Sequence, residues 1–528
     1  MVENLVDGSV LEGGGQILRT AFALSAILHL PLKITRIRAG RPKPGLAAQH
    51  LEGVRLVSKI SCGTIHGDEI GSTELKYTGG PHNLEPLYVA DCGTAGAISL
   101  LIQISLPCLL CHTMDLITIF PSSRVTAIKF FGGTNVNFSP PIDHVIHVFL
   151  PLLSLMSSRV APSMIRVLKR GFYPRGGGAV ELNFDHQLSK LNERGSDGDG
   201  RETNSVCGGM PLEVLRPINL TERGSVTSFH AVVFGNCSIE EKMTMRNMLL
   251  RRVEDTLIPL AKEETIRMLN LLNIRGIQNR SVTAADDVNE MMKGESEIEA
   301  NQDNSNVTTP TVTMDISEDE DDEIPGGKLN PRKRGGNSDN NSNPNDVRKG
   351  ASKFKYEVKT IGALIWYKTD TGCILSSNGM LQYKEYVQKN SSSMNPGSVS
   401  IRDAKIISSS TRPQTPADTS TDSEFLPKLT ECVSTIVDDV IFLFNSGACV
   451  DEHTADQLLI YMSLAQGESR ILCAPIGEES SLHIETVIKV ASELGGSRFR
   501  TEDVLGVSGS ACRLITCSGK PDEADQNS

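Results

Sequence analysis

Three consecutive glycines near the start of the chain are surrounded by an acid, an amide and a guanidinium. They occur in GSVLEGGGQILRTAFALS (residues 8–25), where Glu12, Gln16 and Arg19 are separated by four and three positions. A glycine-rich turn entering a helix presents backbone N–H groups and the positive end of the helix dipole, which suits an anion such as phosphate. If helical geometry begins early, the three side chains share one face, where the acid could hold a metal ion and Arg19 could neutralise phosphate. The glycines alone are better explained by close helix packing, with Arg19 as a solvated helix residue.

Four cations follow within eight residues, in RIRAGRPKPGLAAQH. Arg36 and Arg38 are expected on one face of a strand, because alternate strand residues share a face. Arg41 and Lys43 fall in a turn stiffened by two prolines, just before a second helix. Basic groups at a strand end before a helix N-terminus are typical of an anion cradle, although surface turns often carry a few cations as well.

An acid and a histidine with chemical potential lie near the C-terminus. Asp456, in DEHTADQLLIYMSLA, falls near a helix start, and His483, in SSLHIETVI, opens the next helix. Asp456 could complement the helix dipole, or it could join Glu12 as a metal ligand through a tertiary contact. An isolated histidine at a helix start is more often a surface or capping residue than a nucleophile. These residues alone indicate a phosphate-handling α/β protein.

The bulk composition is that of an ordinary globular protein. The 528 residues suffice for two or three domains with a sizeable core. The net charge of −12 says little about ligands, because much of the acidic excess lies in SEDEDDE (residues 317–323) and a local basic cleft can still bind nucleic acid. The twelve cysteines lack the regular pairing of a secreted scaffold, and Cys108 and Cys111, flanked by leucines, are expected in a helix core. With no expected leader or membrane span, we predict a reducing compartment and no membrane partner.

A helix–strand–helix order occurs three times, within residues 12–60, 92–156 and 451–494. The outer pieces show apolar spacing near 3.6, and β-branched runs lie between them. We therefore predict an α/β (α+β) fold of three repeated units with small sheets that share one core. Residues 1–185 are expected to hold the first two units, and residues 381–528 to hold the third.

A smaller α+β domain is expected at residues 186–380, inserted between the second and third units. Its predicted strands flank a helix that begins at Ser238, with Glu241 completing a capping box. Residues 279–350 and 391–423 are rich in polar residues and proline, and we expect both to be disordered. PRKR, within the first of them, is a candidate nuclear-import signal, although a plain solvated charge cluster explains it equally well.

These motifs resemble the RNA 3'-terminal phosphate cyclase family. The resemblance spans the globular chain from Asp7 to about Phe499, apart from the polar insertions, and rests on an ordered set of motifs: DGSVLEGGGQILR, IRAGRPKPGLAAQHL, GTAG, GGTN…SPPID, RGFYPRGGG, ADQLLIYMSLA and SLHIETVI. It implies three repeated α/β units with a smaller domain inserted before the last.

The resemblance also implies a three-step reaction that consumes ATP. A histidine attacks the α-phosphate of ATP to form a phosphoramidate with AMP. AMP then passes to an RNA 3'-phosphate, giving an RNA-(3')pp(5')A end. The neighbouring 2'-OH finally closes a 2',3'-cyclic phosphate and expels AMP.

The family pattern places the nucleophile on His483. It places Glu12 and Asp456 near the triphosphate and a metal ion, Mg²⁺ or Mn²⁺. The remaining matched positions comprise five polar residues of the phosphate and RNA-end pocket and two residues flanking the adenine: Gln16, Arg19, Arg38, Arg41 and Gln49, then Pro140 and His453. The chain departs from the family at His453, where an aromatic ring is usual, and at His144, where Tyr or Phe is expected.

The chief alternative is a non-catalytic relative of the same fold that acts in ribosome assembly and pre-ribosomal RNA processing. Such relatives lack the nucleophilic histidine and much of the arginine cluster. The residues present here are His483, Arg19, Arg38, Arg41 and Asp456. A more distant alternative is an enolpyruvyl-transferase-like enzyme acting on small metabolites. We therefore expect a cyclase active in RNA processing in the nucleus, or also in the cytosol. The sequence does not indicate an oligomeric state.

Overall fold

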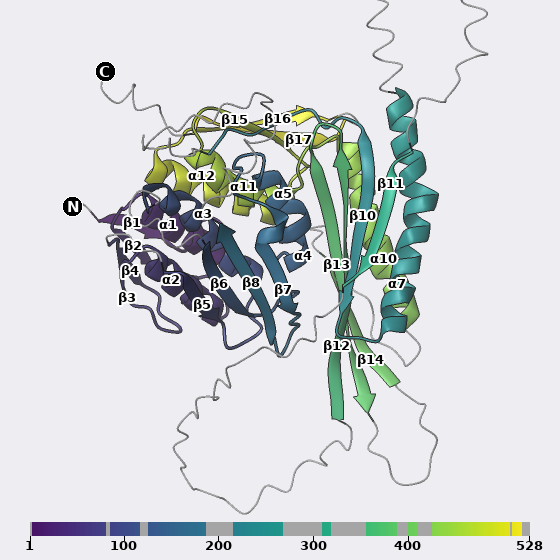
Figure 1. The fold of residues 1–528 in the computed structure, drawn as a ribbon, viewed down its shortest axis with the longest axis horizontal. Helices are drawn as coiled ribbons and strands as arrows, with labels where there is room; N and C mark the ends of the chain where they lie inside the picture. The colour runs from purple at the N-terminus through teal and green to yellow at the C-terminus, as the bar shows by residue number, and fades with distance from the viewer. Residues whose placement is uncertain are drawn as a thin grey trace, which may run out of the picture.

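Within the part of the chain that it describes, the computed structural model is a mixed α/β fold with four separate sheets, of which three have four strands each (Figure 1). This agrees with the predicted fold class. The residues that the structure describes are 3–80, 85–116, 125–185, 215–267, 309–317, 355–387, 400–408, 425–506 and 509–519. None of the helices within these ranges has the length and apolar character needed to cross a bilayer.

The first unit is built from four strands and two helices. In chain order these are β1 (Asn4–Asp7), α1 (Gly15–Ile27), β2 (Leu32–Thr35), α2 (Ala48–Ile60), β3 (Thr64–His66) and β4 (Leu75–Thr78). β1 and β2 pair in parallel, and β4 runs antiparallel to both β2 and β3. The strand order is therefore β1-β2-β4-β3.

The second unit has the same topology. Its elements are β5 (Leu87–Asp91), α3 (Ile98–Leu116), β6 (Val125–Gly132), the helical segments α4 (Ile142–His144), η1 (Val145–Phe149), α5 (Leu150–Leu153) and η2 (Pro162–Met164), β7 (Ile165–Lys169) and β8 (Gly178–Asp185). The strand order β5-β6-β8-β7 repeats that of the first unit, again with a parallel first pair.

The third unit repeats the pattern a third time, but its first strand is separated from the rest. Its elements are β9 (Asn219–Leu220), α11 (Glu452–Leu464), β15 (Ser469–Cys473), α12 (Glu478–Gly495), β16 (Phe499–Leu505) and β17 (Ala511–Cys517). β9 pairs in parallel with β15, although more than two hundred residues separate them. The repeat is thus strand–helix–strand–helix–hairpin, which is longer than the predicted helix–strand–helix because the first strand and the hairpin complete each sheet.

In its described residues, the inserted domain forms a five-stranded sheet with helices on one side (Figure 1). Its elements are β10 (Val226–Gly235), α7 (Ile239–Arg252), η4 (Val253–Leu257), β11 (Thr311–Ile316), β12 (Lys355–Thr369), β13 (Ile374–Val387), β14 (Ser400–Ser408) and α10 (Phe425–Ser446). α7 begins as predicted: Ser238 Oγ accepts the Glu241 N–H at 3.2 Å, and Glu241 Oε2 accepts the Ser238 N–H at 2.9 Å.

The boundaries of this domain differ from the predicted ones. The expected return to the large domain at residue 381 falls within β13, and β14 and α10 continue the same layer. Two stretches expected to be disordered contain strands: β11 pairs with β10, and β14 pairs with β13. Pairing with a neighbouring strand supplies hydrogen bonds to the backbone N–H and C=O groups, whatever the composition of the surrounding segment. The polar content of a segment therefore does not reveal such a strand. The PRKR stretch lies outside the described residues.

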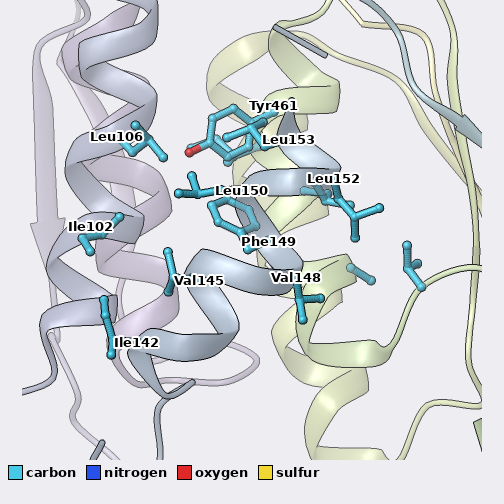
Figure 2. Close-up of a cluster of buried hydrophobic side chains, with 14 of the residues drawn as sticks. Ile102, Leu106, Ile142, Val145, Val148, Phe149, Leu150, Leu152, Leu153 and Tyr461 are labelled. Atoms are coloured by element: carbon cyan, nitrogen blue, oxygen red, sulfur yellow. The ribbon is translucent and has the colours of Figure 1, made fainter. Parts of the chain in front are cut away.

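The core of the large domain lies where helices of the three units meet, with the small sheets around them (Figure 1). Figure 2 shows one part of it, in which Ile102 and Leu106 of α3, Phe149 of η1 and Tyr461 of α11 lie together. Cys108 is fully buried on α3, as expected for a helix-core cysteine. The inserted domain docks on η1 through Trp366, whose ring stacks on His147 at 4.6 Å and on His230 at 5.2 Å between centroids.

Tyr461→Phe is expected to raise the free energy of unfolding by about 1–2 kcal/mol. The centroids of the Tyr461 and Phe149 rings lie 5.9 Å apart. The Tyr461 hydroxyl is buried without a hydrogen-bond partner among the described residues. The variant keeps the ring and removes only the unsatisfied oxygen. Urea denaturation measures the change, and a loss of stability would show that the hydroxyl has a polar partner.

Candidate active site

The predicted site residues fall on loops and helix starts that follow the parallel strands of each unit. Glu12 follows β1, Arg38 and Arg41 follow β2, Pro140 follows β6, and His483 follows β15. In open α/β sheets, ligands bind outside the carboxyl ends of the strands. The repeated topology therefore supplies equivalent loops from three units for one site.

The glycine triplet allows a carboxylate to cap α1. Glu12 Oε2 accepts the backbone N–H of Gly14 at 2.6 Å and that of Gln16 at 3.3 Å. A side chain at Gly14 would collide with this carboxylate. Because the helix begins at Gly15, Glu12 lies outside it and does not share a helical face with Arg19. Gln16 and Arg19 do share a face, and the Arg19 guanidinium donates to Gln16 Oε1.

His50, on α2, faces the same helix start, and it is not among the predicted site residues. A Cβ atom added at Gly15 would lie 2.7 Å from His50 Nε2 and 2.6 Å from Arg19 Nη1. His50 Nδ1 accepts the Ala47 N–H at 3.2 Å, so Nε2 carries the proton. Burial, together with Arg19 and Arg38, lowers the His50 pKa to about 3, so the ring is neutral at pH 7. The sequence offered one indication that His50 belongs to the site: it directly follows Gln49, a predicted site residue.

The basic turn differs in conformation from the prediction. β2 ends at Thr35, and Arg36 and Arg38 adopt left-handed φ values of 52° and 53°. They therefore do not lie on a strand face. The turn buries Ile37 and leaves the two flanking arginines toward solvent, with Arg38 partly buried. Such backbone strain persists only where the surrounding structure holds it, and it is concentrated at binding sites.

Three of the four cations of this turn have specific partners. Arg41 Nη2 donates to Glu12 Oε1 at 2.7 Å and to the Glu12 carbonyl at 3.2 Å. Arg38 Nη1 donates to the Gly45 carbonyl at 2.8 Å, and burial, then Arg41, lowers its pKa. Arg36 pairs with Asp7, and Lys43 is exposed. Arg41 thus joins the basic turn to the glycine triplet.

α11 contributes an acid to the same region. Asp451 is the N-cap of α11, and its Oδ1 accepts the Thr454 N–H at 2.7 Å. Asp456 therefore lies beyond the cap, and it lines a pocket between α1, α3 and α11. The other residues lining that pocket are Gln16, Arg19, Thr20, Gln103, Gln457 and Ile460. Burial raises the Asp456 pKa to about 7, and electrostatic interactions with His453 and Arg19 oppose this shift only in part.

The helix of His483 reaches the glycine triplet directly. Thr486 Oγ1, on α12, accepts the backbone N–H of Glu12 at 3.3 Å. His483 lies three residues earlier and is half-buried. Residues three apart lie on one face of a helix, so His483 and Thr486 share the face that meets Glu12. α12 also packs against α1 and α11.

Pro140 and His453 lie on segments that meet. Ser99 Oγ donates to the Pro140 carbonyl at 2.7 Å, and Gln49 Oε1 accepts the Ala97 N–H at 3.0 Å. His144, four residues after Pro140, is buried and hydrogen-bonds Thr454 Oγ1 at 3.1 Å. Burial lowers the His144 pKa to about 4. This bond joins the Pro140 segment to the start of α11, where His453 lies partly exposed with its Nε2 3.7 Å from Glu452 Oε1.

A buried ion pair holds the segment that follows Pro140, because Asp143 pairs with Arg170. Arg170 donates two hydrogen bonds to Asp143, at 2.8 Å and 2.7 Å, and Asn135 Nδ2 donates to the same carboxylate at 3.0 Å. Burial alone would raise the Asp143 pKa, but Arg170 and then Asn135 outweigh it and lower the pKa. Local spacing gives no sign of this pair, because Asp143 and Arg170 are 27 residues apart in the chain.

Two carboxylates near one guanidinium are the candidates for a metal site, although both oxygens of Glu12 also accept hydrogen bonds from the protein. Glu12 and Asp456 both act electrostatically on Arg19, which places them around one guanidinium. Within the described ranges, no group of three or more His, Cys, Asp or Glu side chains could hold a metal. A pair of carboxylates suits Mg²⁺ or Mn²⁺, which take most of their remaining ligands from water and substrate phosphates. The raised Asp456 pKa fits a site that a cation would stabilise in its ionised form.

The fold and this site define a three-unit α/β protein that gathers arginines, two acids and a histidine at a glycine-rich helix start. The chain belongs to the RNA 3'-terminal phosphate cyclase family, whose model matches residues 10–501. This confirms the resemblance.

Individual relatives carry the same description. The chain is 26% identical over 519 residues to a "Probable RNA 3'-terminal phosphate cyclase" of Dictyostelium discoideum, covering 97% of this chain and 82% of the relative. It is 44% identical over 177 residues to an "RNA 3'-terminal phosphate cyclase" of Archaeoglobus fulgidus, covering 34% of this chain and 50% of the relative. A Hyperthermus butylicus protein of the same description is 38% identical over 223 residues, covering 42% and 51%. The chain thus matches about half the length of these archaeal relatives.

Asp456→Asn is expected to stabilise the metal-free protein at alkaline pH but not at acid pH. The pKa of Asp456 rises from an ordinary 3.8 to about 7, so the ionised carboxylate destabilises the fold as pH rises across this interval. The amide removes that penalty, which we place on the order of 1–2 kcal/mol at pH 8 because the group is only partly buried. Thermal unfolding at pH 4, 6 and 8 with a chelator measures it; an equal shift at every pH would contradict the expectation.

Proposed function

We propose that this chain is an enzyme that converts an RNA 3'-terminal phosphate to a 2',3'-cyclic phosphate at the expense of ATP. The observation that carries this proposal is the Glu12 to Thr486 hydrogen bond, which brings the helix of His483 to the glycine triplet. Arg19, Arg41 and Asp456 lie around the same helix start. Family membership supports the substrate class.

The proposed chemistry has three displacements at phosphorus. A ring nitrogen of His483 attacks the α-phosphate of ATP, forming a P–N bond as pyrophosphate leaves. An oxygen of the RNA 3'-phosphate then attacks the same phosphorus, and the P–N bond breaks. The 2'-OH finally attacks the 3'-phosphorus, losing its proton while AMP leaves. Neutral imidazole suits the first step because it is nucleophilic near pH 7 and its phosphoramidate transfers readily.

Each displacement accumulates charge on phosphoryl oxygens, and the site supplies donors for it. We assign this role to Arg19, Arg38 and Arg41, whose guanidinium forks match phosphate geometry. Gln16 and Gln49 are assigned as polar contacts of the same pocket. His50 adds an uncharged N–H donor, because its Nδ1 is occupied by the Ala47 N–H.

We assign Glu12 and Asp456 to a bound Mg²⁺ or Mn²⁺, which when present neutralises charge on the triphosphate. Glu12 would keep its helix-capping bonds through Oε2, since a carboxylate accepts several hydrogen bonds. We assign Pro140 and His453 to the two faces of the adenine. The His453 imidazole can stack on a base but offers less area than a larger aromatic ring.

The test is a cyclisation assay on the full chain. A short RNA with a labelled 3'-phosphate is incubated with ATP and Mg²⁺ or Mn²⁺, and the label is then challenged with phosphatase. The expected result is ATP-dependent conversion to a phosphatase-resistant end, with AMP released. A protein that binds pre-ribosomal RNA but never protects the label would instead be the non-catalytic assembly factor. A nuclear location is proposed with this function, and imaging of a tagged chain tests it.

A further inference from the structure

Two aromatic side chains stand in solvent beside the proposed site. Phe138, in the loop after β6, is 98% exposed, and Tyr173, in the loop after β7, is 53% exposed. Phe138 also has a left-handed φ of 61°, which is a rare and strained conformation for a bulky residue. Both the exposure and the strain of Phe138 oppose folding. Such an outlier is a reason to look for a binding role.

The two loops lie side by side. The backbone N–H groups of Thr134 and Asn135 both donate to the Gly171 carbonyl, at 2.8 Å and 3.2 Å. Asn135 also forms a β-bridge with Phe172, directly before Tyr173. Arg175, in the second loop, has a side chain that is 79% exposed, and its ion pair with Glu357 is long at 3.6 Å. An exposed pair of this kind contributes little, so the guanidinium can exchange partners.

These loops continue directly into the proposed phosphate site. β5, β6 and β7 run in the same direction, so the loops that follow them emerge at one edge of the sheet. The loop after β5 hydrogen-bonds both to the loop after β6 and to α2. The Gly133 N–H donates to the Gly96 carbonyl at 2.8 Å, and the Ala97 N–H donates to Gln49 Oε1 at 3.0 Å. Pro140 lies two residues after Phe138.

We propose that Phe138, Tyr173 and Arg175 form a platform for the single-stranded RNA nucleotides that precede the 3'-phosphate. Single-stranded RNA is held by stacking its bases on aromatic rings and by placing Arg on its backbone, without regard to base identity. An RNA end anchored in the pocket leads its upstream nucleotides across the adjoining loops, where these side chains stand. The platform rests on the proposed function and adds where the body of the substrate lies.

The experiment measures binding without ATP, so that no cyclisation occurs. Fluorescence anisotropy gives the affinity of the full chain for a ten-nucleotide RNA and for a dinucleotide, both with 3'-phosphates. The wild type is expected to bind the longer RNA at least tenfold more tightly. Phe138→Gly and Tyr173→Ala are each expected to weaken binding of the longer RNA by about tenfold and to leave binding of the dinucleotide unchanged. Phe138→Trp, which retains a stacking surface, is expected to bind the longer RNA as the wild type does.

Stability distinguishes this role from a structural one. Phe138→Gly relieves the left-handed strain, so its melting temperature is expected to rise while its RNA affinity falls. Leu505→Ala, at another exposed apolar side chain on β16, is the control for nonspecific loss of apolar surface. If Phe138→Gly and Tyr173→Ala bind the ten-nucleotide RNA as the wild type does, the platform is wrong. If the wild type binds both RNAs equally, the platform is excluded but the proposed reaction is not. If the wild type binds neither RNA, both the platform and the proposed function are contradicted.

Discussion

His483→Ala is expected to abolish covalent labelling of the protein by ATP that is radiolabelled at the α-phosphate. The reason is chemical: without the imidazole, no group at the start of α12 can form the P–N bond, while the Glu12 to Thr486 contact that holds α12 in place remains. Loss of a covalent nucleophile typically lowers the rate by at least about 10³-fold. The label is measured on denaturing gels after incubation with Mg²⁺ or Mn²⁺.

The control is His66→Ala. His66 is an exposed histidine on β3, at the edge of the first sheet. This variant is expected to label as the wild type does. An acid-labile and alkali-stable bond would identify the linkage as a phosphoramidate. Undiminished labelling of His483→Ala, with wild-type melting behaviour, would move the nucleophile to another residue and refute the assignment.

Arg170→Met is expected to lower the free energy of unfolding by about 3–5 kcal/mol. The Arg170 and Asp143 side chains are only 7% and 3% exposed, so removing the guanidinium leaves an uncompensated buried carboxylate. Arg55→Met is the matched control, because Arg55 bonds Asp68 at the similar distance of 2.8 Å but the two side chains are 43% and 31% exposed. It is expected to cost about 1 kcal/mol or less. Urea denaturation measures both.

The pH dependence of this variant gives a second readout. The folded-state pKa of Asp143 lies below its ordinary 3.8, so its stabilising contribution is present above about pH 4 and is lost as pH falls further. The loss of unfolding free energy caused by Arg170→Met should therefore become smaller toward acid pH. The double variant Arg170→Met/Asp143→Leu, which removes both charges, should recover part of the loss. Equal costs for Arg170→Met and Arg55→Met would show that burial of the pair is unimportant.

Local patterns in the sequence determined the element types and the existence of three α/β units. The Ser238 cap of α7 was predictable because Ser238 and Glu241 are three residues apart and satisfy each other's backbone groups. The glycine triplet marked the start of α1 for a similar reason, since the constraint lies within a few residues. The family motifs named the candidate site residues, but they did not provide its geometry.

Packing between distant segments decided the rest. β9 is only two residues long, and it is a strand because β15 pairs with it. Arg36 and Arg38 left the predicted strand because burying Ile37 required a turn there. The approach of His50 to Gly15 and the bond from Glu12 to Thr486 join residues far apart in sequence. Spacing along a chain reports which neighbours share a face, whereas such contacts depend on how whole helices and sheets pack, and only the tertiary structure contains that information.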